Sequence, residues 1–354
     1  MLTAWFSGAG RIDVREVDDP VIVDPLDVIV DITFAGICGS DLWGYRGLLN
    51  RPAGSTGHEF IGRVREIGRD VRSVVPGDSV IAPFVYSDGT CTECRRGLHS
   101  HCANVGRWGK EVSGAQAERI RVPYADATLV KLPWDSSDID AELARKLVPL
   151  TDVFATGTHG AVLAGVGDGD VVAVVGDGAV GISAAIASAR IGAERVILFG
   201  EQISRLSVAA EHGIETVLIT RDDDVSERLR AINDDVLADR VIECVGLQSA
   251  FDGALSLVRP GGSMGFVGVP HGVDELAPMR IFDNETRIAG GVAPARHYLE
   301  QFVEDTAAGR LDVSTLIDSV LPFEEVAAGY EAMSSGSALK VVVSIASRET
   351  PTGR

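Results

Sequence analysis

Three cysteines, Cys91, Cys94 and Cys102, lie within twelve residues of one another. The chain contains five cysteines, an odd number, and a cluster of this kind in a reducing compartment favours metal binding over disulfides. A C-x-x-C pair with a third cysteine eight residues later is a fairly specific pattern for a closed tetrahedral zinc site, which needs one more ligand. A histidine of the same segment could supply that ligand, or the segment could hold no metal. The three cysteines therefore indicate a structural zinc site.

Cys38 and His58 form a second pair of candidate metal ligands. Cys38 stands in the motif GICGSD at 36–41, and His58 stands in the motif GHE at 57–59. Zinc binds thiolate and imidazole groups, and the glycines beside each residue relieve crowding around it. Either residue alone is more often part of a buried core, so the pair needs a further ligand before it indicates a metal site.

A glycine-rich motif, GDGAVG at 176–181, follows an apolar strand expected at 171–175 and precedes an Ala-rich helix expected at 182–191. The first glycine permits a tight turn, the second lets backbone N–H groups approach a pyrophosphate, and the third lets the helix pack on the strand. The N-terminus of the helix also favours an anion. An ordinary glycine turn is the alternative, but the later βα units favour dinucleotide binding, with contacts from Gly176, Gly178, Ala179, Val180 and Gly181.

The residue that meets the adenosine ribose is expected at the end of the next strand, about 20 residues after the glycines. There the strand expected at 196–199 is followed by Gly200 and Glu201. With Gly200 in the usual acidic position, no carboxylate repels a 2′-phosphate, and Arg205 is near enough in sequence to reach one. We therefore expect NADP to be favoured over NAD, although Glu201 could instead accept the ribose hydroxyls and favour NAD.

The segments that must position these residues differ between the two parts of the chain. Between 21 and 124, short apolar stretches are separated by Gly and Pro turns, which indicates an all-β, barrel-like region. From 168 onward, apolar strands at 171–175, 196–199, 241–245 and 264–269 alternate with helical stretches, which predicts a parallel sheet with right-handed crossovers. We expect a helix at 298–309, a strand at 340–345 and a frayed polar tail at 348–354.

Composition limits the partners and the location of the chain. Its 354 residues are enough for two domains, and 51 acidic against 32 basic residues give a formal net charge of −19. Such a charge repels a phosphate backbone, so we expect no nucleic-acid partner. No apolar run reaches the ~18–20 residues that cross a bilayer, and the first residues do not resemble a secretory leader. We expect a cytoplasmic protein with no membrane partner.

Taken together, the motifs resemble those of the zinc-containing medium-chain dehydrogenase/reductase family, which includes alcohol, sorbitol, threonine and formaldehyde dehydrogenases. The resemblance also includes PGDSV at 76–80 and RPGG at 259–262, and it covers nearly the whole chain. The family has a structural zinc site of four cysteines, and here Asp88 stands at the position of the first, so the resemblance implies a structural zinc ion held by Asp88, Cys91, Cys94 and Cys102. It implies an α/β protein with a GroES-like, β-rich catalytic domain over 1–153 and 292–354. A Rossmann domain with a doubly wound parallel sheet is implied over 154–291. We also expect a homo-oligomer, either a dimer or a tetramer.

The resemblance implies a catalytic zinc ion held by Cys38, His58 and a third ligand, which lies four residues before a Thr-Gly pair. That third position is Asp152, where many relatives have cysteine, and a carboxylate oxygen is an acceptable and harder zinc ligand. Asp152 could instead lie near the zinc without binding it, with Glu59 supplying the third bond. We expect Cys38, His58 and Asp152 to be the three ligands.

The same resemblance implies roles for residues near the zinc. Ser40 is expected to accept the alcohol proton, with the cofactor ribose hydroxyls next in the relay, unless it merely satisfies local backbone groups. Asp41 is expected to brace His58. Trp43 stands where many relatives have histidine, and an indole cannot pass a proton onward, so the relay must end in water or another group. Contacts to the cofactor are further expected from Thr156, Gly268, Val269, Gly290 and Lys340.

These expectations describe a zinc-dependent oxidoreductase that moves a hydride between an alcohol and NAD(P), with a secondary alcohol or a polyol favoured. Its partner would be a small alcohol or carbonyl compound. One alternative is a zinc-binding, NADPH-dependent reductase of an activated C=C bond, which would not reduce the cofactor in the presence of an alcohol. A second alternative is a non-catalytic dinucleotide-binding regulator, for which Cys38 and His58 would be superfluous.

Overall fold

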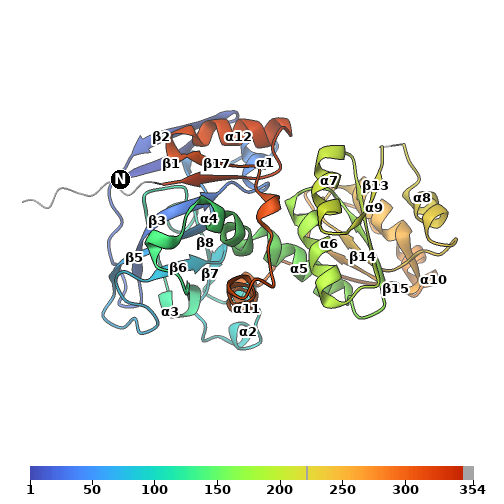
Figure 1. Ribbon diagram of the computed structural model, residues 1–354, viewed down its shortest axis with the longest axis horizontal. Helices are drawn as coiled ribbons and strands as arrows, with labels where there is room; N and C mark the ends of the chain where they lie inside the picture. The colour runs from blue at the N-terminus through green and yellow to red at the C-terminus, as the bar shows by residue number, and fades with distance from the viewer. Residues whose placement is uncertain (221, 346–354) are drawn as a thin grey trace, which may run out of the picture. The chain divides into compact units, whose positions relative to one another are not determined.

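The computed structural model describes residues 1–220 and 222–345, so the polar tail expected at 348–354 lies outside the described residues. The chain forms two compact units. The first contains Met1–Asp152 and the segment that begins at Pro294, and the second is Val153–Ala293 (Figure 1). Among the described residues, no helix has both the length and the apolar character needed to span a membrane.

The first unit is built around a seven-stranded sheet with the order β10-β6-β5-β3-β18-β17, in which β9 also pairs with β3. Its strands are antiparallel except for β17 and β18, which run parallel. The strand β18 comes from the C-terminal part of the chain and pairs with β3, placing Val343 opposite Ala35. The bounds are β3 Val28–Gly36, β5 Glu59–Ile67, β6 Ser79–Ala82, β9 Arg119–Val122, β10 Val130–Lys131, β17 Ser319–Pro322 and β18 Val341–Ser344.

Smaller elements complete this unit. A three-stranded sheet has the order β2-β1-β4, and β7 pairs with β8. The core between them is apolar and aromatic, with the ring of Trp108 meeting that of Phe60 edge-on at 5.3 Å. The bounds are β1 Leu2–Gly8, β2 Arg11–Glu16, β4 Gly54–Ser55, β7 Val85–Tyr86, β8 Gly106–Arg107, α1 Asp41–Tyr45, α2 Thr92–Arg95, α3 Ala125–Thr128, α4 Ala141–Leu147, α11 Ala295–Ala307 and α12 Val326–Ser335.

The second unit is a doubly wound parallel sheet with the strand order β13-β12-β11-β14-β15-β16. Numbered within the unit, this order is 3-2-1-4-5-6, which is the Rossmann arrangement, and its order reverses between β11 and β14. The strands are β11 Val171–Val175, β12 Arg195–Gly200, β13 Glu215–Leu218, β14 Ala238–Glu243, β15 Val258–Phe266 and β16 Arg287–Gly290. The helices are α5 Val153–Ala164, α6 Ala179–Ile191, α7 Ile203–Glu211, α8 Val225–Ile232, α9 Gln248–Leu257 and α10 Pro278–Asp283.

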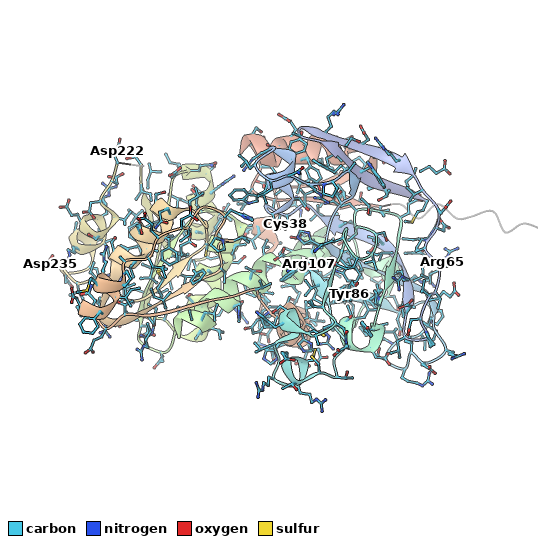
Figure 2. All side chains as sticks on the ribbon, turned by 180° about the vertical axis from the view of Figure 1, so that it is seen from behind. Cys38, Arg65, Tyr86, Arg107, Asp222 and Asp235 are labelled. Carbon is cyan, nitrogen blue, oxygen red and sulfur yellow. The ribbon has the colours of Figure 1, made fainter. Side chains whose placement is uncertain are left out.

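Alternation along the buried strands explains why this sheet carries helices on both faces. Val241 belongs to an apolar cluster with Phe251 of α9, whereas the next residue, Ile242, faces Gly160 of α5. Both units also carry exposed charged side chains. Figure 2 shows Asp222 and Asp235 projecting from the second unit, and the side chain of Asp235 is 88% exposed.

Candidate active site and metal centres

Paired strands bring Cys38 and His58 together. Cys38 follows the end of β3, and His58 precedes the start of β5. These strands are antiparallel partners with Gly36 opposite Glu59, so the end of one lies beside the start of the other. Asp152 follows the short 3-10 helix Val148–Thr151 and reaches the same place. Two strand ends and one helix end therefore meet at a single point in the first unit.

The three side chains are in direct contact. Cys38 Sγ lies 3.2 Å from Asp152 Oδ2, and His58 Nε2 lies 3.1 Å from the same oxygen. With Glu59 included, one ligand atom from each of the four residues lies within 4.8 Å of all the others. Sulfur, imidazole nitrogen and carboxylate oxygen are the donors that zinc takes in proteins. The donor set and its spacing fit a zinc ion.

The electrostatics of the cluster call for a cation. Burial, assisted by the neighbouring Asp152 carboxylate, raises the pKa of Cys38 to about 11, so without a cation this thiol keeps its proton. Burial is the largest single influence on Asp152 and acts to raise its pKa, but the hydrogen bond and charge of His58, the charge of Lys340 and the hydrogen bond with Cys38 together lower the pKa. A divalent cation would favour the thiolate that zinc binding requires.

The expected contact between Lys340 and the cofactor does not fit the structure. Its side chain is 1% exposed, and its Nζ donates to Glu59 Oε1 at 2.8 Å, to Glu59 Oε2 at 2.6 Å and to the carbonyl of Ile37 at 3.1 Å. All three N–H donors of the ammonium group are therefore used inside the first unit. Lys340 is the counter-ion of Glu59, which supports Asp152 rather than Glu59 as the third zinc ligand.

Asp41 and Ser40 lie at the start of the short helix α1. Asp41 Oδ2 accepts a hydrogen bond from the backbone N–H of Cys38 at 3.2 Å, and its Oδ1 lies 3.7 Å from His58 Nδ1. Asp41 thus contacts both candidate ligands. Ser40 is exposed at the N-terminus of α1, and its hydroxyl makes no capping hydrogen bond to this helix. Its hydroxyl is therefore not used to satisfy the helix end, and Trp43 on the same helix is partly buried.

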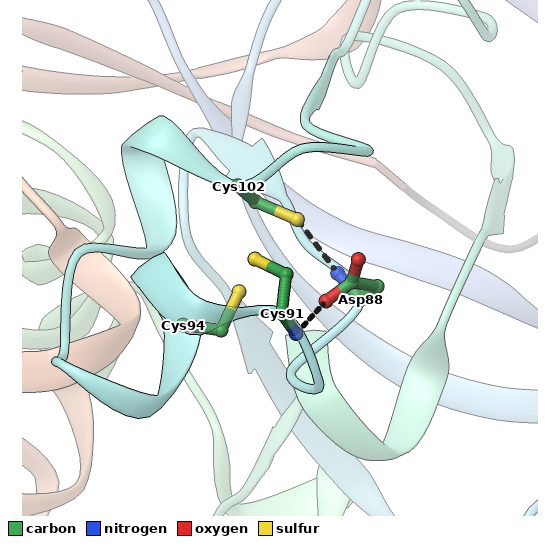
Figure 3. A group of neighbouring side chains, drawn as sticks. All are labelled: Asp88, Cys91, Cys94 and Cys102. Atoms are coloured by element: carbon green, nitrogen blue, oxygen red, sulfur yellow. Dashed lines mark hydrogen bonds between the residues drawn. The ribbon is translucent and has the colours of Figure 1, made fainter.

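The cysteine segment forms a second cluster (Figure 3). The cluster consists of Asp88, Cys91, Cys94 and Cys102, and one ligand atom from each lies within 4.8 Å of the other three. Among the described residues, the histidines of this segment are not part of the cluster. Asp88 Oδ1 accepts hydrogen bonds from the backbone N–H groups of Thr90 at 2.7 Å and Cys91 at 3.0 Å. These bonds hold the carboxylate beside the three sulfur atoms, where it can complete a tetrahedral set.

The glycine motif has the backbone geometry that its sequence predicts. Gly176 has a φ of +113°, and a Cβ built on Gly181 would lie 1.7 Å from the carbonyl oxygen of Gly176. Gly178 caps α6, and a Cβ built there would meet nothing within 4 Å. The helix thus begins at Ala179, with Val180 in its first turn, directly against the end of β11. An open, glycine-lined helix N-terminus is suited to a pyrophosphate.

The other expected cofactor contacts lie on separate elements of the second unit. Thr156 is on α5, Gly268 and Val269 follow β15, and Gly290 ends β16. The last three positions are therefore at the carboxyl edge of the parallel sheet, where ligands bind in this fold. Arg205, expected to be available for a 2′-phosphate, instead has its Nη1 3.6 Å from Asp177 Oδ1.

Comparison with known proteins agrees with this geometry. Residues 24–134 match the alcohol dehydrogenase GroES-like domain, and residues 179–308 match the zinc-binding dehydrogenase family. The chain is 31% identical to zinc-type alcohol dehydrogenase B of Aspergillus flavus, over 97% of this chain and 81% of that protein. It belongs to the zinc-containing medium-chain dehydrogenase family.

Two solved structures resemble this zinc-containing dehydrogenase along almost its entire length. Alcohol dehydrogenase TADH from Thermus sp. ATN1 is 33% identical, with a TM-score of 0.89 and coverage of 98% of this chain and 100% of that one. A protein from Sinorhizobium meliloti 1021, described as a zinc-binding dehydrogenase and solved with bound NADP, is 27% identical, with a TM-score of 0.83 and coverage of 97% and 98%. The GroES-like and Rossmann parts expected from the sequence are thus confirmed.

Sequence reasoning missed three positions in this dehydrogenase. Gly36 must be glycine, because a Cβ there would lie 1.9 Å from Glu59 Oε2. Lys340 was assigned to the cofactor, but in the structure it neutralises Glu59. The two residues are about 280 positions apart, and no sequence pattern predicts a pair at that separation. Asp177, the second residue of the glycine motif, was given no role. Its approach to the end of β12 follows only once the two strands are known to be neighbours.

Proposed function

We propose that this dehydrogenase transfers a hydride between an alcohol, with a secondary alcohol or a polyol favoured, and a nicotinamide dinucleotide, using a zinc ion held by Cys38, His58 and Asp152. The contact of Asp152 with both other ligands, at 3.2 and 3.1 Å, carries the proposal. Membership of an alcohol dehydrogenase family supports the reaction class. It does not favour a C=C reductase or a non-catalytic regulator. The first unit would be the catalytic part.

When bound, zinc supplies a Lewis acid that polarises the oxygen of the substrate. The residues around it hold and orient its ligands. Asp41, close to His58 Nδ1 and bonded to the backbone of Cys38, fixes both ligands. Ser40, exposed and not engaged in capping, would accept the proton of the alcohol and pass it toward the ribose of the cofactor. The indole of Trp43 cannot continue that relay.

The second cluster would hold a structural zinc ion. Asp88 takes the place of a fourth cysteine, and its hydrogen bonds to Thr90 and Cys91 fix the carboxylate before the metal arrives. Four protein ligands would leave no open position, which is typical of structural rather than catalytic zinc. Full occupancy of both clusters would give two zinc ions per chain.

The dinucleotide would bind the second unit at the open N-terminus of α6, with its pyrophosphate at Gly178. Thr156 and Gly290 would help to orient the nicotinamide. Gly268 and Val269 would line the site in which the cofactor binds. The sequence favoured NADP because Gly200 lacks a carboxylate and Arg205 lies nearby. In the structure Arg205 Nη1 lies 3.6 Å from Asp177 Oδ1, so its charge already faces a carboxylate of this chain.

A homo-oligomer, a dimer or tetramer, is also proposed. The strand β16 is at the edge of its sheet, and α10 next to it exposes Met279 and Phe282, at 67% and 77%. An open strand edge beside exposed apolar side chains is suited to pairing with a second copy. A cytoplasmic location remains a prediction.

One experiment tests the proposed function most directly. The purified protein is analysed for zinc and screened with primary, secondary, polyol and amino alcohols, each with NAD and with NADP. Cofactor reduction is followed by the absorbance of the reduced nicotinamide. We expect two zinc ions per chain and alcohol-dependent reduction, strongest for a secondary alcohol or a polyol. Reduction of an activated C=C bond by NADPH, without any alcohol oxidation, would contradict the proposal. Asp88→Asn should lose one zinc ion.

A further inference from the structure

The turn after β11 carries a carboxylate to the end of the neighbouring strand. β11 and β12 are parallel partners, with Val175 opposite Phe199, so the residues that follow each strand are neighbours. A Cβ built on Gly200 would lie 2.5 Å from the Cβ of Asp177 and 2.7 Å from its Oδ2. Asp177 therefore occupies the space that a side chain at position 200 would need.

Backbone donors at the end of β12 anchor this carboxylate. Asp177 Oδ2 accepts hydrogen bonds from the N–H groups of Glu201 at 2.8 Å and Gln202 at 2.7 Å, and its Oδ1 lies 3.6 Å from Arg205 Nη1. The residue is 9% exposed. The donors that follow β12 and the nearest cation of α7 are thus already paired with an anion that belongs to this chain.

A carboxylate at the end of this strand has a defined purpose in the Rossmann fold. It accepts hydrogen bonds from the adenosine ribose, whereas a 2′-phosphate requires a cation there instead. We propose that Asp177, supplied by the glycine motif rather than by position 200, is the carboxylate that binds this ribose and excludes a 2′-phosphate. The protein then prefers NAD over NADP. This inference rests on the proposed function, because it needs a bound dinucleotide, and it replaces the sequence-based preference for NADP.

The charges around Gly200 support this choice. Asp177 and Glu201 each contribute a carboxylate, whereas Arg205 contributes a single positive charge. A 2′-phosphate would bring further negative charge beside the buried carboxylate of Asp177, where like charges repel strongly. The Nε of Arg205 is buried and has no hydrogen-bond partner among the described residues. A preference for NADP over NAD would therefore have to come from Arg205.

The test measures binding without turnover. Isothermal titration calorimetry on the full chain compares ADP-ribose with 2′-phospho-ADP-ribose. The wild type should bind ADP-ribose at least about tenfold more tightly, which corresponds to about 1.4 kcal/mol. Asp177→Asn keeps the size of the side chain and removes its charge, so the ratio of the two affinities should fall at least about fivefold. The ratio of kcat/KM for NAD to that for NADP should fall in the same direction.

Two variants sharpen the result. Asp170 also accepts a backbone N–H, from Gly167 at 2.8 Å, and also pairs with an arginine, Arg240 at 3.0 Å. Asp170→Asn is therefore a matched control in the same unit and should leave the ratio unchanged. Arg205→Gln should leave the preference for ADP-ribose in place, because Arg205 is not the group that selects the cofactor.

Each outcome decides the matter. Tighter binding of the 2′-phosphorylated fragment by the wild type overturns the inference and leaves the proposed function intact. An unchanged ratio in Asp177→Asn with a normal melting curve also overturns the inference. Binding of neither fragment overturns both. If Asp177→Asn does not fold, the wild-type ratio and the Arg205→Gln variant decide.

Discussion

Lys340 Nζ donates to both carboxylate oxygens of Glu59, at 2.8 and 2.6 Å, in an environment where neither side chain is more than 1% exposed. Replacing Lys340 by Met leaves a buried carboxylate without its counter-ion. We expect Lys340→Met to lower the free energy of unfolding by about 3–5 kcal/mol, measured by urea denaturation. The double variant Glu59→Gln with Lys340→Met should recover part of that loss. Wild-type stability in the single variant would show that this pair is not a structural necessity.

Asp152 is the most specific element of the proposed catalytic zinc site. We expect Asp152→Ala to lose the catalytic zinc and to lower kcat/KM by more than about 100-fold, because one of three ligands is removed. Zinc content by mass spectrometry and steady-state kinetics check this. Glu142→Ala changes an exposed carboxylate on the nearby helix α4 and should alter neither quantity. Full zinc content and activity in Asp152→Ala would remove Asp152 from the ligand set.

Ser40 is proposed as the first proton acceptor. Ser40→Ala should slow hydride transfer by about 100-fold, a loss typical of a missing acid–base group, while zinc content stays at the wild-type level. Single-turnover formation of reduced cofactor measures this step. Ser137→Ala, an exposed serine in the same unit, serves as the control. Unchanged transfer in Ser40→Ala would mean that the alcohol proton leaves by another route.

Two glycines of the same motif should respond differently to the same methyl group. Gly181→Ala places a Cβ 1.7 Å from a backbone oxygen and should destabilise the second unit by about 1–3 kcal/mol. Gly178→Ala meets nothing within 4 Å, so it should fold normally but bind ADP-ribose at least about tenfold more weakly, because the methyl group enters the pyrophosphate site. Melting curves and calorimetry separate the two effects. Normal ADP-ribose affinity in Gly178→Ala would place the pyrophosphate elsewhere.

Asp239 gives the second unit a pH-dependent contribution to stability. Burial acts to raise its pKa, but hydrogen bonds from the backbone N–H of Val171 and from Arg259 outweigh burial and lower it. A lowered pKa in the folded state stabilises the protein above the unfolded pKa of ~3.9, and this contribution is lost as the pH falls through the folded pKa. Asp239→Asn should cost about 1 kcal/mol at pH ~7 and progressively less below pH ~4, measured by urea denaturation.

The control for that prediction is Asp235→Asn. The side chain of Asp235 is 88% exposed, so the substitution should change the free energy of unfolding by almost nothing. A difference between wild type and Asp239→Asn that stays constant from neutral to acidic pH would contradict the assignment of the lowered pKa.

Local patterns predicted most elements of the second unit, whereas the exact first and last residues of these elements were predicted less well. The strand at 171–175 was placed at its observed bounds, because five apolar residues end at a glycine that must turn. The helix begins at Ala179 rather than at 182, since Gly178 acts as its cap. The strand expected at 264–269 is instead Val258–Phe266, because its pairing with β14 resumes at Val258 beyond an irregularity that contains the Pro and Gly residues.

Within the candidate sites, motifs predicted residues that are close in sequence or fixed by a known spacing. Asp88 could be named because it stands where the resembled family has the first of four cysteines. The pair of Lys340 with Glu59, and the approach of Asp177 to Gly200, depend on strand pairing between distant segments. One sequence contains no local signal for such contacts, so only the folded chain shows them.

The pairing of β18 with β3 also determines when the metal-binding unit can be completed. Cys38, His58 and Asp152 precede the second unit in the chain, whereas Lys340 and the strand after it are made only after the whole of that unit. During synthesis the Rossmann unit can fold before Lys340, the counter-ion of Glu59, has been made. The first unit can therefore close around its buried charge only after β18 has been made, and a nascent chain stalled before residue 340 would hold Glu59 without its counter-ion.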